Sequence, residues 1–291
     1  MNRRALLLSG LIVALAGPAL GQDRRRRLSE RRRDDGDGEG VSDAPRVTVV
    51  YGPHPKQAFD VYDDAGAAGP VLVFVHGGGW SRGDKAMVHD LPDYARRHGL
   101  TLVSINYRLV PEVTAREQAQ DLAAAIARVR QDRPGRPIVL LGHSAGAHLT
   151  ALVGVDPRYL GEHGLTPSDL AGVVTLDSAA YDATLPRPAG PAGRYLERLY
   201  DDAFGDQRAD LSPTLRVRSG VRYPPFLIFH VVSREDSATQ SRGLAQALIA
   251  VGGRAETVAA PDDSHAEING EFGQAGDAEG ERAARFIASL R

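Results

Sequence analysis

The residues best suited to chemistry surround one serine. In the stretch LLGHSAGAHL, residues 140–149, Ser144 lies between Gly142 and Gly146, where an apolar run ends and a helix-like run begins. A G-x-S-x-G sequence at such a junction forms a strained turn that lifts the hydroxyl above a sheet, and its glycines relieve clashes with neighbouring backbone. The start of the next helix directs free N–H groups toward that hydroxyl. Ser144 is therefore a candidate nucleophile.

A serine nucleophile needs a base to take its proton, and the base needs an acid to orient it. For this turn the expected order along the chain is serine, acid, histidine. His265 lies in the polar loop PDDSHAEIN after the last expected strand, whereas His230 lies inside the apolar run FLIFHVV and is expected to pack or bond internally. His265 is the predicted base.

Two aspartates compete for the orienting role. Asp236 follows the run FLIFHVV in the segment SRED, where a loop carboxylate could reach the His265 ring, and it is the predicted acid. Asp177 ends the preceding expected strand, residues 172–177, and is the serious competitor. Adjacent loop acids are usually solvated, so three others are weaker candidates: Glu235, Asp262 and Asp263.

The motif HGGGW at residues 76–80 could supply the donors that acyl transfer requires. Attack on a carbonyl creates an oxyanion, and each preorganised N–H donor stabilises it by roughly 3–4 kcal/mol. Glycines let the backbone come that close. The predicted donors are the backbone N–H groups of Gly78, Gly79 and Ala145. A phosphate loop does not fit, because no Gly-Lys-Ser/Thr follows the glycines.

Other side chains near these motifs are expected to shape the site. His76 is expected to orient the glycine loop rather than titrate. Trp80, His143 and Tyr181 are predicted to line the substrate pocket, with a buried packing role an equal alternative for Trp80.

These candidates need a sheet to position them. Short β-rich runs alternate with helix-like ones, which predicts a mainly parallel sheet flanked by helices. The first two runs lie close together around a Pro-containing turn, as in an antiparallel hairpin. The eight expected strands are 47–52, 58–63, 71–77, 101–107, 137–142, 172–177, 226–232 and 255–260.

Helical patterns lie between the later strands. In 113–132 the apolar positions recur at spacings of three and four, as one buried helix face requires: Ala115, Ala119, Leu122, Ile126 and Val129. Residues 179–223 differ, being rich in Pro, Gly and Arg with a short helical piece near RYLERLYDDAF. We expect this segment to be a cap-like insertion over one edge of the sheet.

Composition bounds the remaining classes. The chain has 291 residues, 42% of them hydrophobic, and a formal charge of −2, so one substantial core is expected and no nucleic-acid partner is indicated. The absence of cysteine excludes disulfides, thiolate catalysis and cysteine-bound metals. The histidines show no metal-binding spacing, so no metal or cofactor is expected. The sequence leaves the oligomeric state undetermined.

The N-terminal segment indicates export. Residues 1–21 carry two arginines, a short apolar stretch and small residues before Gln22, which is typical of a removed signal peptide. A retained membrane anchor is the alternative, but the stretch is shorter than a span and is broken by Gly17-Pro18. Residues 22–45 are densely charged with both signs, which predicts a disordered spacer before a catalytic domain at 46–291. The predicted location is secreted or periplasmic.

With HGGGW, GHSAG and a later Asp and His in that order, the chain resembles the α/β-hydrolase superfamily. Within it the chain is most similar to HGGG-type carboxylesterases and to the feruloyl-esterase-like (BD-FAE-like) and formamidase-like proteins. The similarity covers most of residues 50–291, and the two motifs at this separation are highly specific. Further matching segments are Asn106-Tyr107-Arg108-Leu109, Phe204-Gly205, Leu211-Ser212-Pro213, PPFLIF, Gln240-Ser241 and Leu244.

The resemblance implies an α/β-hydrolase fold, a mostly parallel eight-stranded sheet with helices on both faces. It also implies Ser144 as nucleophile, His265 as base and Asp236 as orienting acid, with the oxyanion donors named above. Two regions depart from the family pattern. The link HVVSRED is longer and more polar than the usual Gly-containing one, and it is followed by Ser237-Ala238 where the family usually has an apolar residue. Residues 179–223, where selectivity would be set, match poorly.

Together these features predict a secreted serine hydrolase of carboxylic esters. Short acyl chains are expected, because 179–223 is too polar for a lipase-like cover. The expected partner is a small-molecule ester, with no stable membrane insertion once the signal is removed. The same triad serves amide cleavage, as in a formamidase or exopeptidase, and a catalytically silent hydrolase fold used for binding is the alternative from another class.

Overall fold

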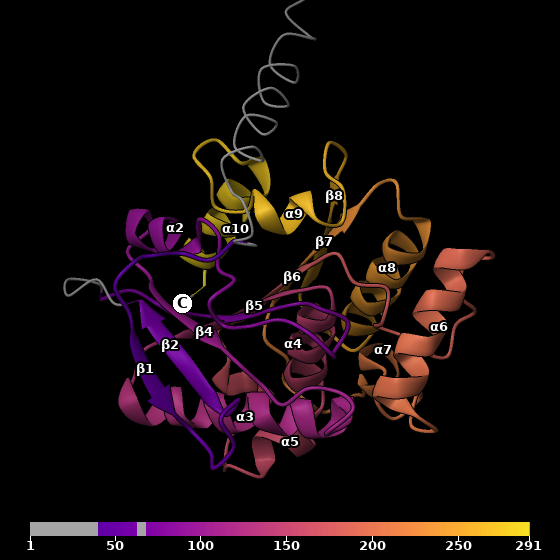
Figure 1. The fold of residues 1–291 in the computed structure, drawn as a ribbon, viewed down its shortest axis with the longest axis horizontal. Coiled ribbons are helices and arrows are strands. Elements are labelled where there is room, and N and C mark those ends of the chain that lie inside the picture. Colours follow the sequence, from indigo (N-terminus) through magenta and orange to yellow (C-terminus); the bar gives the residue numbers. More distant parts are fainter. Residues whose placement is uncertain (1–39, 63–67, 291) are drawn as a thin grey trace, which may run out of the picture. The chain divides into compact units, whose positions relative to one another are not determined.

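The computed structural model describes residues 40–62 and 68–290 as a twisted sheet with helices on both sides (Figure 1). The predicted signal peptide and the part of the charged spacer before residue 40 lie outside the described residues. The spacer was expected to reach residue 45, but Val41 already forms an antiparallel bridge with Met87. Among the described residues, no helix has the length and apolar character needed to cross a bilayer.

The sheet confirms the predicted set of eight strands. Its spatial order is β1-β2-β4-β3-β5-β6-β7-β8. β2 pairs antiparallel with β1, as the expected hairpin requires, and also with β4, and the remaining pairs are parallel. The strands are β1 Val47–Val50, β2 Ala58–Tyr62, β3 Val71–Val75, β4 Thr101–Ile105, β5 Ile138–His143, β6 Gly172–Leu176, β7 Phe226–Val231 and β8 Ala255–Ala260.

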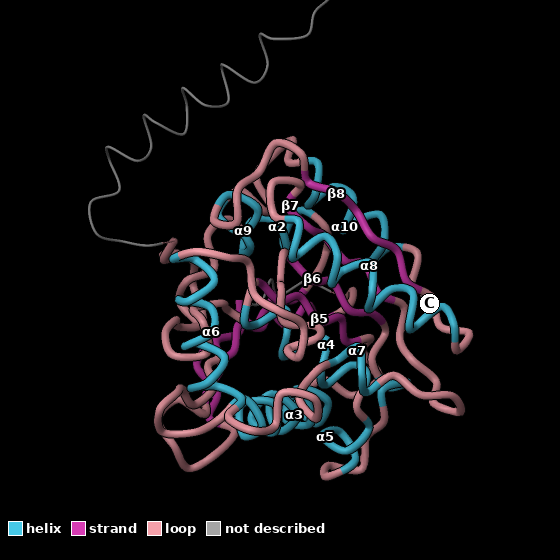
Figure 2. Tube along the Cα trace, turned by 90° about the vertical axis from the view of Figure 1, so that its right-hand side faces the viewer, coloured by secondary structure: helices cyan, strands magenta, loops and turns pink. Residues whose placement is uncertain are grey.

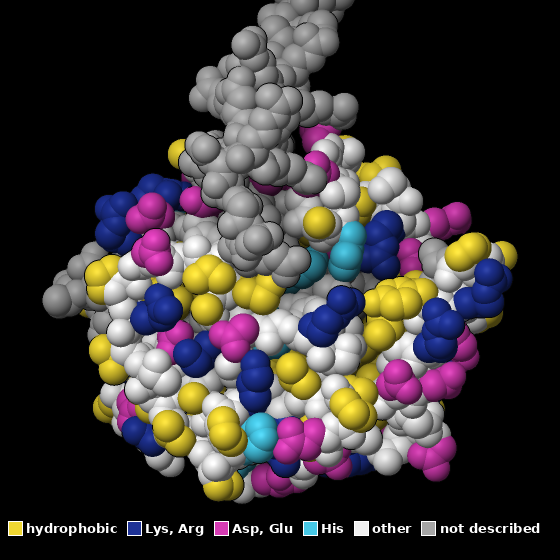
Figure 3. All heavy atoms as spheres, in the orientation of Figure 1, with side chains coloured by type: hydrophobic (Ala, Val, Ile, Leu, Met, Phe, Trp, Pro, Cys, Tyr) yellow, Lys and Arg dark blue, Asp and Glu magenta, His cyan; other side chains and the backbone are white. Residues whose placement is uncertain are grey.

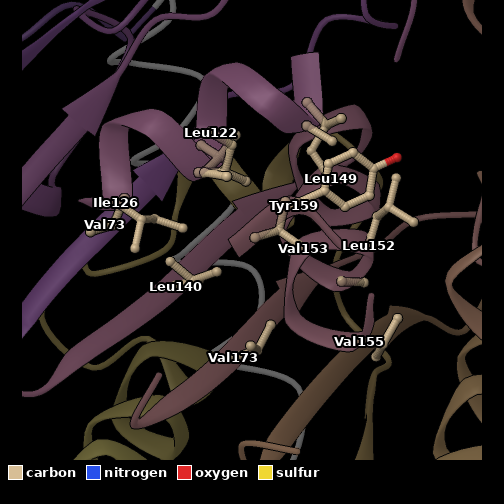
Figure 4. Packing of buried hydrophobic residues seen from close by; sticks show 14 of the residues in the cluster. Val73, Leu122, Ile126, Leu140, Leu149, Leu152, Val153, Val155, Tyr159 and Val173 are labelled. Carbon is tan, nitrogen blue, oxygen red and sulfur yellow. The ribbon is translucent and has the colours of Figure 1, made fainter. Parts of the chain in front are cut away.

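Strand side chains alternate between two apolar cores. In β3, Val71, Val73 and Val75 enter one core, while Leu72 and Phe74 enter the other. This period of two sends each strand into both layers. Figure 4 shows the first core, where Val73 and Leu140 of the sheet pack with residues of the covering helices. A central strand buried on both faces reads as a continuous apolar run, as observed here.

Helices cover both faces of the sheet, as Figure 2 also shows. Side chains from α3 Ala115–Asp132, α4 Ala145–Val155, α5 Pro157–Gly161 and α8 Glu235–Ala250 join the first core. Those from α2 Leu91–Arg97, α9 Glu267–Gly270 and α10 Ala278–Ala288 join the second. The short 3₁₀ helix η1, Pro167–Asp169, precedes β6.

Helix α3 shows why the periodic pattern was a reliable signal. Its five predicted core positions are all at most 1% exposed. Thr114 caps the first turn, and the Glu117 carboxylate accepts a hydrogen bond from the Thr114 backbone N–H. This capping box satisfies N–H groups that would otherwise be unpaired. The helix therefore begins where its cap and its apolar stripe both require.

Residues 179–223 contain two helices, α6 Pro191–Phe204 and α7 Pro213–Arg216. Figures 1 and 2 show α6 at the edge of the molecule. Its inner side joins the first core through Tyr200, Ala203 and Phe204. The segment is thus attached to the sheet by aromatic packing despite its polar composition.

Charges of both signs are interspersed over the face drawn in Figure 3. Among the described residues, Arg96 pairs with Asp93 at 3.2 Å within α2, and Arg128 pairs with Asp132 at 2.9 Å within α3. Exposed pairs of this kind contribute at most about 1 kcal/mol each. The two apolar cores, rather than surface ion pairs, therefore stabilise the fold.

Glu279 of α10 should make stability depend on pH. Burial and the nearby carboxylates of Asp263 and Asp277 raise the pKa of Glu279 from 4.5 to about 7. Protonated Glu279 thus favours the folded state below pH 4.5, and this contribution is lost as pH rises toward 7. Glu279→Gln should reduce the fall in unfolding free energy over this range by about 2 kcal/mol, measured by urea denaturation at several pH values.

The matched control is Glu281→Gln, since Glu281 is exposed on the same helix. It should leave the pH dependence as in the wild type. Equal pH dependence in the Glu279→Gln variant and the wild type would refute the role of Glu279.

Candidate active site

Ser144 occupies a strained turn between β5 and α4. Its backbone has φ 55° and ψ −115°, a conformation that costs an ordinary residue about 1–3 kcal/mol. A Cβ added to Gly146 would lie 2.1 Å from the carbonyl oxygen of Val75, and one added to Gly142 would lie 2.4 Å from that of Gly146. Only glycine fits at these two positions, which explains the G-x-S-x-G spacing.

His265 joins Ser144 to a carboxylate. Its Nε2 lies 3.1 Å from Ser144 Oγ, and its Nδ1 lies 2.6 Å from Asp177 Oδ2. An ionised carboxylate only accepts hydrogen bonds, so Nδ1–H donates to Asp177 and Nε2 is left to accept the serine proton. The imidazole is 40% exposed, whereas Asp177 is fully buried. Ser144, His265 and Asp177 therefore form a hydrogen-bonded chain whose buried end is the carboxylate of Asp177.

Asp177 is held ionised by converging donors. Oδ1 accepts from the backbone N–H of Val231 at 3.0 Å and the Ser237 hydroxyl at 2.6 Å. Oδ2 accepts from His265 and from Arg234 Nη1 at 2.5 Å. Burial would raise the pKa of Asp177, but the His265 bond, the Arg234 charge and the other bonds outweigh burial and hold this pKa well below its usual range. Asp177 is therefore a fixed negative charge.

The structure corrects the prediction of Asp236 as the partner of His265. Asp236 lies in the first turn of α8, where its nearest cation is Arg234 Nη2 at 3.6 Å. Asp177 directly follows β6, which pairs with the serine-bearing strand β5, whereas the loop that carries His265 follows β8, which pairs with β7. Strand adjacency alone therefore does not select the acid, and the distance of 2.6 Å between His265 Nδ1 and Asp177 Oδ2 identifies it. Arg234 and Ser237 were missed by the sequence reasoning.

The glycine loop presents free donors beside Ser144. Gly78 and Gly79 have φ 109° and 58°. Within the described chain, the backbone N–H groups of Gly78, Gly79 and Ala145 donate no hydrogen bond to another protein group. A Cβ on Gly77 would lie 3.1 Å from Ser144 Cβ, so this loop borders the serine. Donors available at such a position suit an oxyanion.

His76 packs on Tyr107 and supports the start of the glycine loop. It is 3% exposed and stacks on Tyr107 with ring centroids 4.4 Å apart. The Tyr107 hydroxyl donates to the His76 carbonyl at 2.9 Å. Burial lowers the pKa of His76 to about 4, so the side chain is neutral at pH 7, in line with an orienting role.

His143 contacts the loop and the ring of the base, His265. Its Nε2–H donates to the His265 carbonyl at 2.9 Å, and the two rings lie 4.7 Å apart. Burial, with His265 beside it, lowers the pKa of His143 to about 3. The neutral His143 side chain therefore fixes the backbone of the loop that carries His265.

Trp80 and Tyr181 do not line an open pocket. Trp80 is 4% exposed, donates from Nε1 to His148 Nδ1 at 3.2 Å, and meets Phe204 edge-on with centroids 4.9 Å apart. The packing alternative for Trp80 is the one observed. Tyr181 is fully buried in the first core, and the prediction that it contacts substrate is wrong for this conformation. Trp80 is covered by Tyr200 and Phe204 of α6, which meet its ring edge-on.

A cavity of about 550 Å³ lies at the N-terminal ends of the central strands, away from Ser144 and Asp177. Its wall includes Pro137, Ala171 and Pro225, which directly precede β5, β6 and β7. Ser144 and Asp177 follow the other ends of β5 and β6. The catalytic candidates therefore do not belong to this cavity.

Comparisons with known proteins find similar esterases. The family model described as BD-FAE matches residues 59–163. Esterase LipC of Mycobacterium tuberculosis is 31% identical over 232 residues, covering 73% of this chain and 53% of that protein. Isoprenylcysteine alpha-carbonyl methylesterase ICME of Arabidopsis thaliana is 28% identical over 243 residues, covering 77% and 57%. The chain thus spans about half the length of these curated relatives.

Among solved structures, esterase B from Lactobacillus rhamnosis has the same fold. The two superpose with a TM-score of 0.69 at 23% identity, covering 93% of this chain and 94% of that one. The chain therefore has the α/β-hydrolase fold, and the curated relatives and solved structures to which it is similar include esterases.

Proposed function

We propose that the protein hydrolyses carboxylic esters, with a preference for short acyl chains, through an acyl-enzyme on Ser144. One observation carries the proposal: Ser144 Oγ, His265 and Asp177 form a continuous chain with distances of 3.1 and 2.6 Å. The esterase relatives support the reaction class, although the chain covers only about half of their length.

The position of each group suits the task proposed for it. His265 Nε2 takes the proton as Ser144 Oγ attacks the ester carbonyl, and the N–H groups of the glycine loop and Ala145 receive the oxyanion. Asp177 stabilises the imidazolium formed in this step. His265 then protonates the leaving alcohol, and a water molecule activated by the same imidazole releases the acid. This sequence uses only groups of the chain and water.

Leu199 of α6 supports the preference for short acyl chains. A Cβ added to Gly79 would lie 3.1 Å from Leu199 Cδ1, so the isobutyl group of Leu199 packs against the glycine loop. Nearby on α6, the Tyr195 hydroxyl accepts from Arg82 Nη2 at 3.1 Å, which joins the helix to the same loop. A long acyl chain bound on this side would have to displace Leu199.

Leu199→Ala should extend the range of accepted acyl chains. Removing the isobutyl group opens space over Gly79, so kcat/KM for p-nitrophenyl octanoate should rise about tenfold relative to the acetate. Leu215→Ala is a suitable control, since Leu215 is an exposed leucine in α7. An unchanged octanoate-to-acetate ratio in Leu199→Ala would remove Leu199 from the account.

The reaction class is tested with the mature protein and p-nitrophenyl esters from acetate to palmitate, beside p-nitroacetanilide. Ester turnover that greatly exceeds anilide turnover supports the proposal. Faster anilide cleavage would identify an amide hydrolase, and absence of both activities would leave the silent binding fold.

We also propose that the protein is exported, on the strength of residues 1–21 alone. Expression of the full chain in a Gram-negative host followed by intact-mass measurement of the periplasmic fraction tests this. The expected product begins near Gln22. A full-length product confined to the cytoplasm would contradict export.

A further inference from the structure

We propose that Arg234 is a positioning residue that holds Asp177 and sets the pH range in which His265 acts as base. This inference rests on the proposed ester hydrolysis and deepens it. Sequence patterns gave no indication of Arg234, which emerges only from the contacts in the folded chain.

Arg234 touches both members of the acid–base pair. Its Nη1 lies 2.5 Å from Asp177 Oδ2 and 2.7 Å from His265 Nδ1. Both nitrogens carry hydrogen when Asp177 is ionised, so they do not bond each other and instead share one carboxylate oxygen. The guanidinium is 23% exposed, which leaves its charge only partly screened.

The position of Arg234 is unfavourable for its own helix. Arg234 is the N-cap of α8, and its side chain makes no capping bond. A helix N-terminus carries partial positive charge and disfavours a cation. Glu235 and Asp236 in the first turn offset part of this cost. Helix stability therefore does not account for an arginine here, whereas contact with the catalytic pair does.

The charge of Arg234 acts on the protonated base. Besides Arg234, the titratable side chains seen to contact the imidazole in the described part of the chain are Asp177, which follows β6, and His143 at the end of β5. Within the described chain, Asp236 is the only charged residue of α8 that contacts Arg234, at 3.6 Å. When His265 takes a proton, two cations share the single charge of Asp177. Removal of the Arg234 charge would therefore leave the imidazolium beside the carboxylate of Asp177 without a competing cation.

The test compares variants that separate the charge from the hydrogen bond. Arg234→Gln keeps an N–H donor without the charge, Arg234→Met removes both, and Arg234→Lys keeps the charge. Arg242→Met, at an exposed arginine of the same helix, is the matched control. The measurements are kcat and KM for p-nitrophenyl acetate from pH 4 to 9, with circular dichroism to confirm folding.

In both the Gln and Met variants the acidic limb of kcat/KM should move to higher pH by about one unit, while the Lys variant moves by less than half as much. The Gln variant, which retains the bond to Asp177, carries the result if the Met variant does not fold. A fall in kcat at every pH with the limb unmoved would reduce Arg234 to a structural tether and overturn the proposal.

A second readout separates this inference from the proposed function. The His265 ring signal, identified in NMR spectra by its loss in His265→Asn, should titrate at higher pH in Arg234→Gln than in the wild type. That shift is expected even if no ester is turned over, in which case only the proposed reaction fails. Identical titration in the two proteins would overturn the role of Arg234.

Discussion

Asp177→Asn is expected to lower kcat for p-nitrophenyl acetate by about 10⁴-fold. Asp177 accepts a bond from His265 Nδ1 at 2.6 Å, which fixes the tautomer whose Nε2 can take the Ser144 proton. An asparagine that donates its N–H₂ to Nδ1 would place the ring proton on Nε2 instead. The loss should therefore appear in kcat, with KM changed only slightly.

The matched control is Asp236→Asn, which alters the carboxylate two residues after Arg234. Asp236 touches Arg234 at 3.6 Å and has no direct bond to His265 among the described contacts. Its activity should stay within about threefold of the wild type, since a partly exposed pair of this kind contributes less than about 1 kcal/mol. A larger loss in Asp236→Asn than in Asp177→Asn would restore the original sequence prediction.

Ser144→Ala should abolish turnover almost completely, by about 10⁶-fold in kcat. Without Oγ no acyl-enzyme forms, and the remaining oxyanion donors stabilise only a direct attack by water. Alanine in a backbone with φ 55° is as strained as serine, so stability should change little. Steady-state kinetics and a thermal melt measure the two effects together.

Ser233→Ala provides the control for Ser144→Ala, because Ser233 is an exposed serine in the loop after β7. It should turn over ester at the wild-type rate. Retained hydrolysis in Ser144→Ala would contradict the assignment of the nucleophile.

Local pattern was sufficient for the sheet. Each expected strand is a short apolar run, and burial on both faces keeps such runs recognisable. Helix α3 and the turn at Ser144 could be predicted for the same reason. The spacing of apolar residues marks the buried face of α3, and Gly142 and Gly146 mark the tight turn. His230 is 8% exposed within β7, as its apolar surroundings indicated.

The acid of the triad could not be identified in the same way. The bond between His265 and Asp177 joins residues 88 positions apart, and its formation depends on which strand end lies beside the His265 loop. Asp236 and Asp177 both follow strands, so local sequence does not separate them. The burial of Trp80 similarly depends on Phe204 of α6, far along the chain.

The most direct measurement of the catalytic arrangement is the rate at which a fluorophosphonate modifies Ser144, followed by peptide mass spectrometry in the wild type, Asp177→Asn and Asp236→Asn. We expect a phosphonyl adduct on Ser144 alone, formed at similar rates in the wild type and Asp236→Asn and at least about 100-fold more slowly in Asp177→Asn. An unmodified Ser144 in the wild type, or equal rates in all three proteins, would contradict a triad of Ser144, His265 and Asp177.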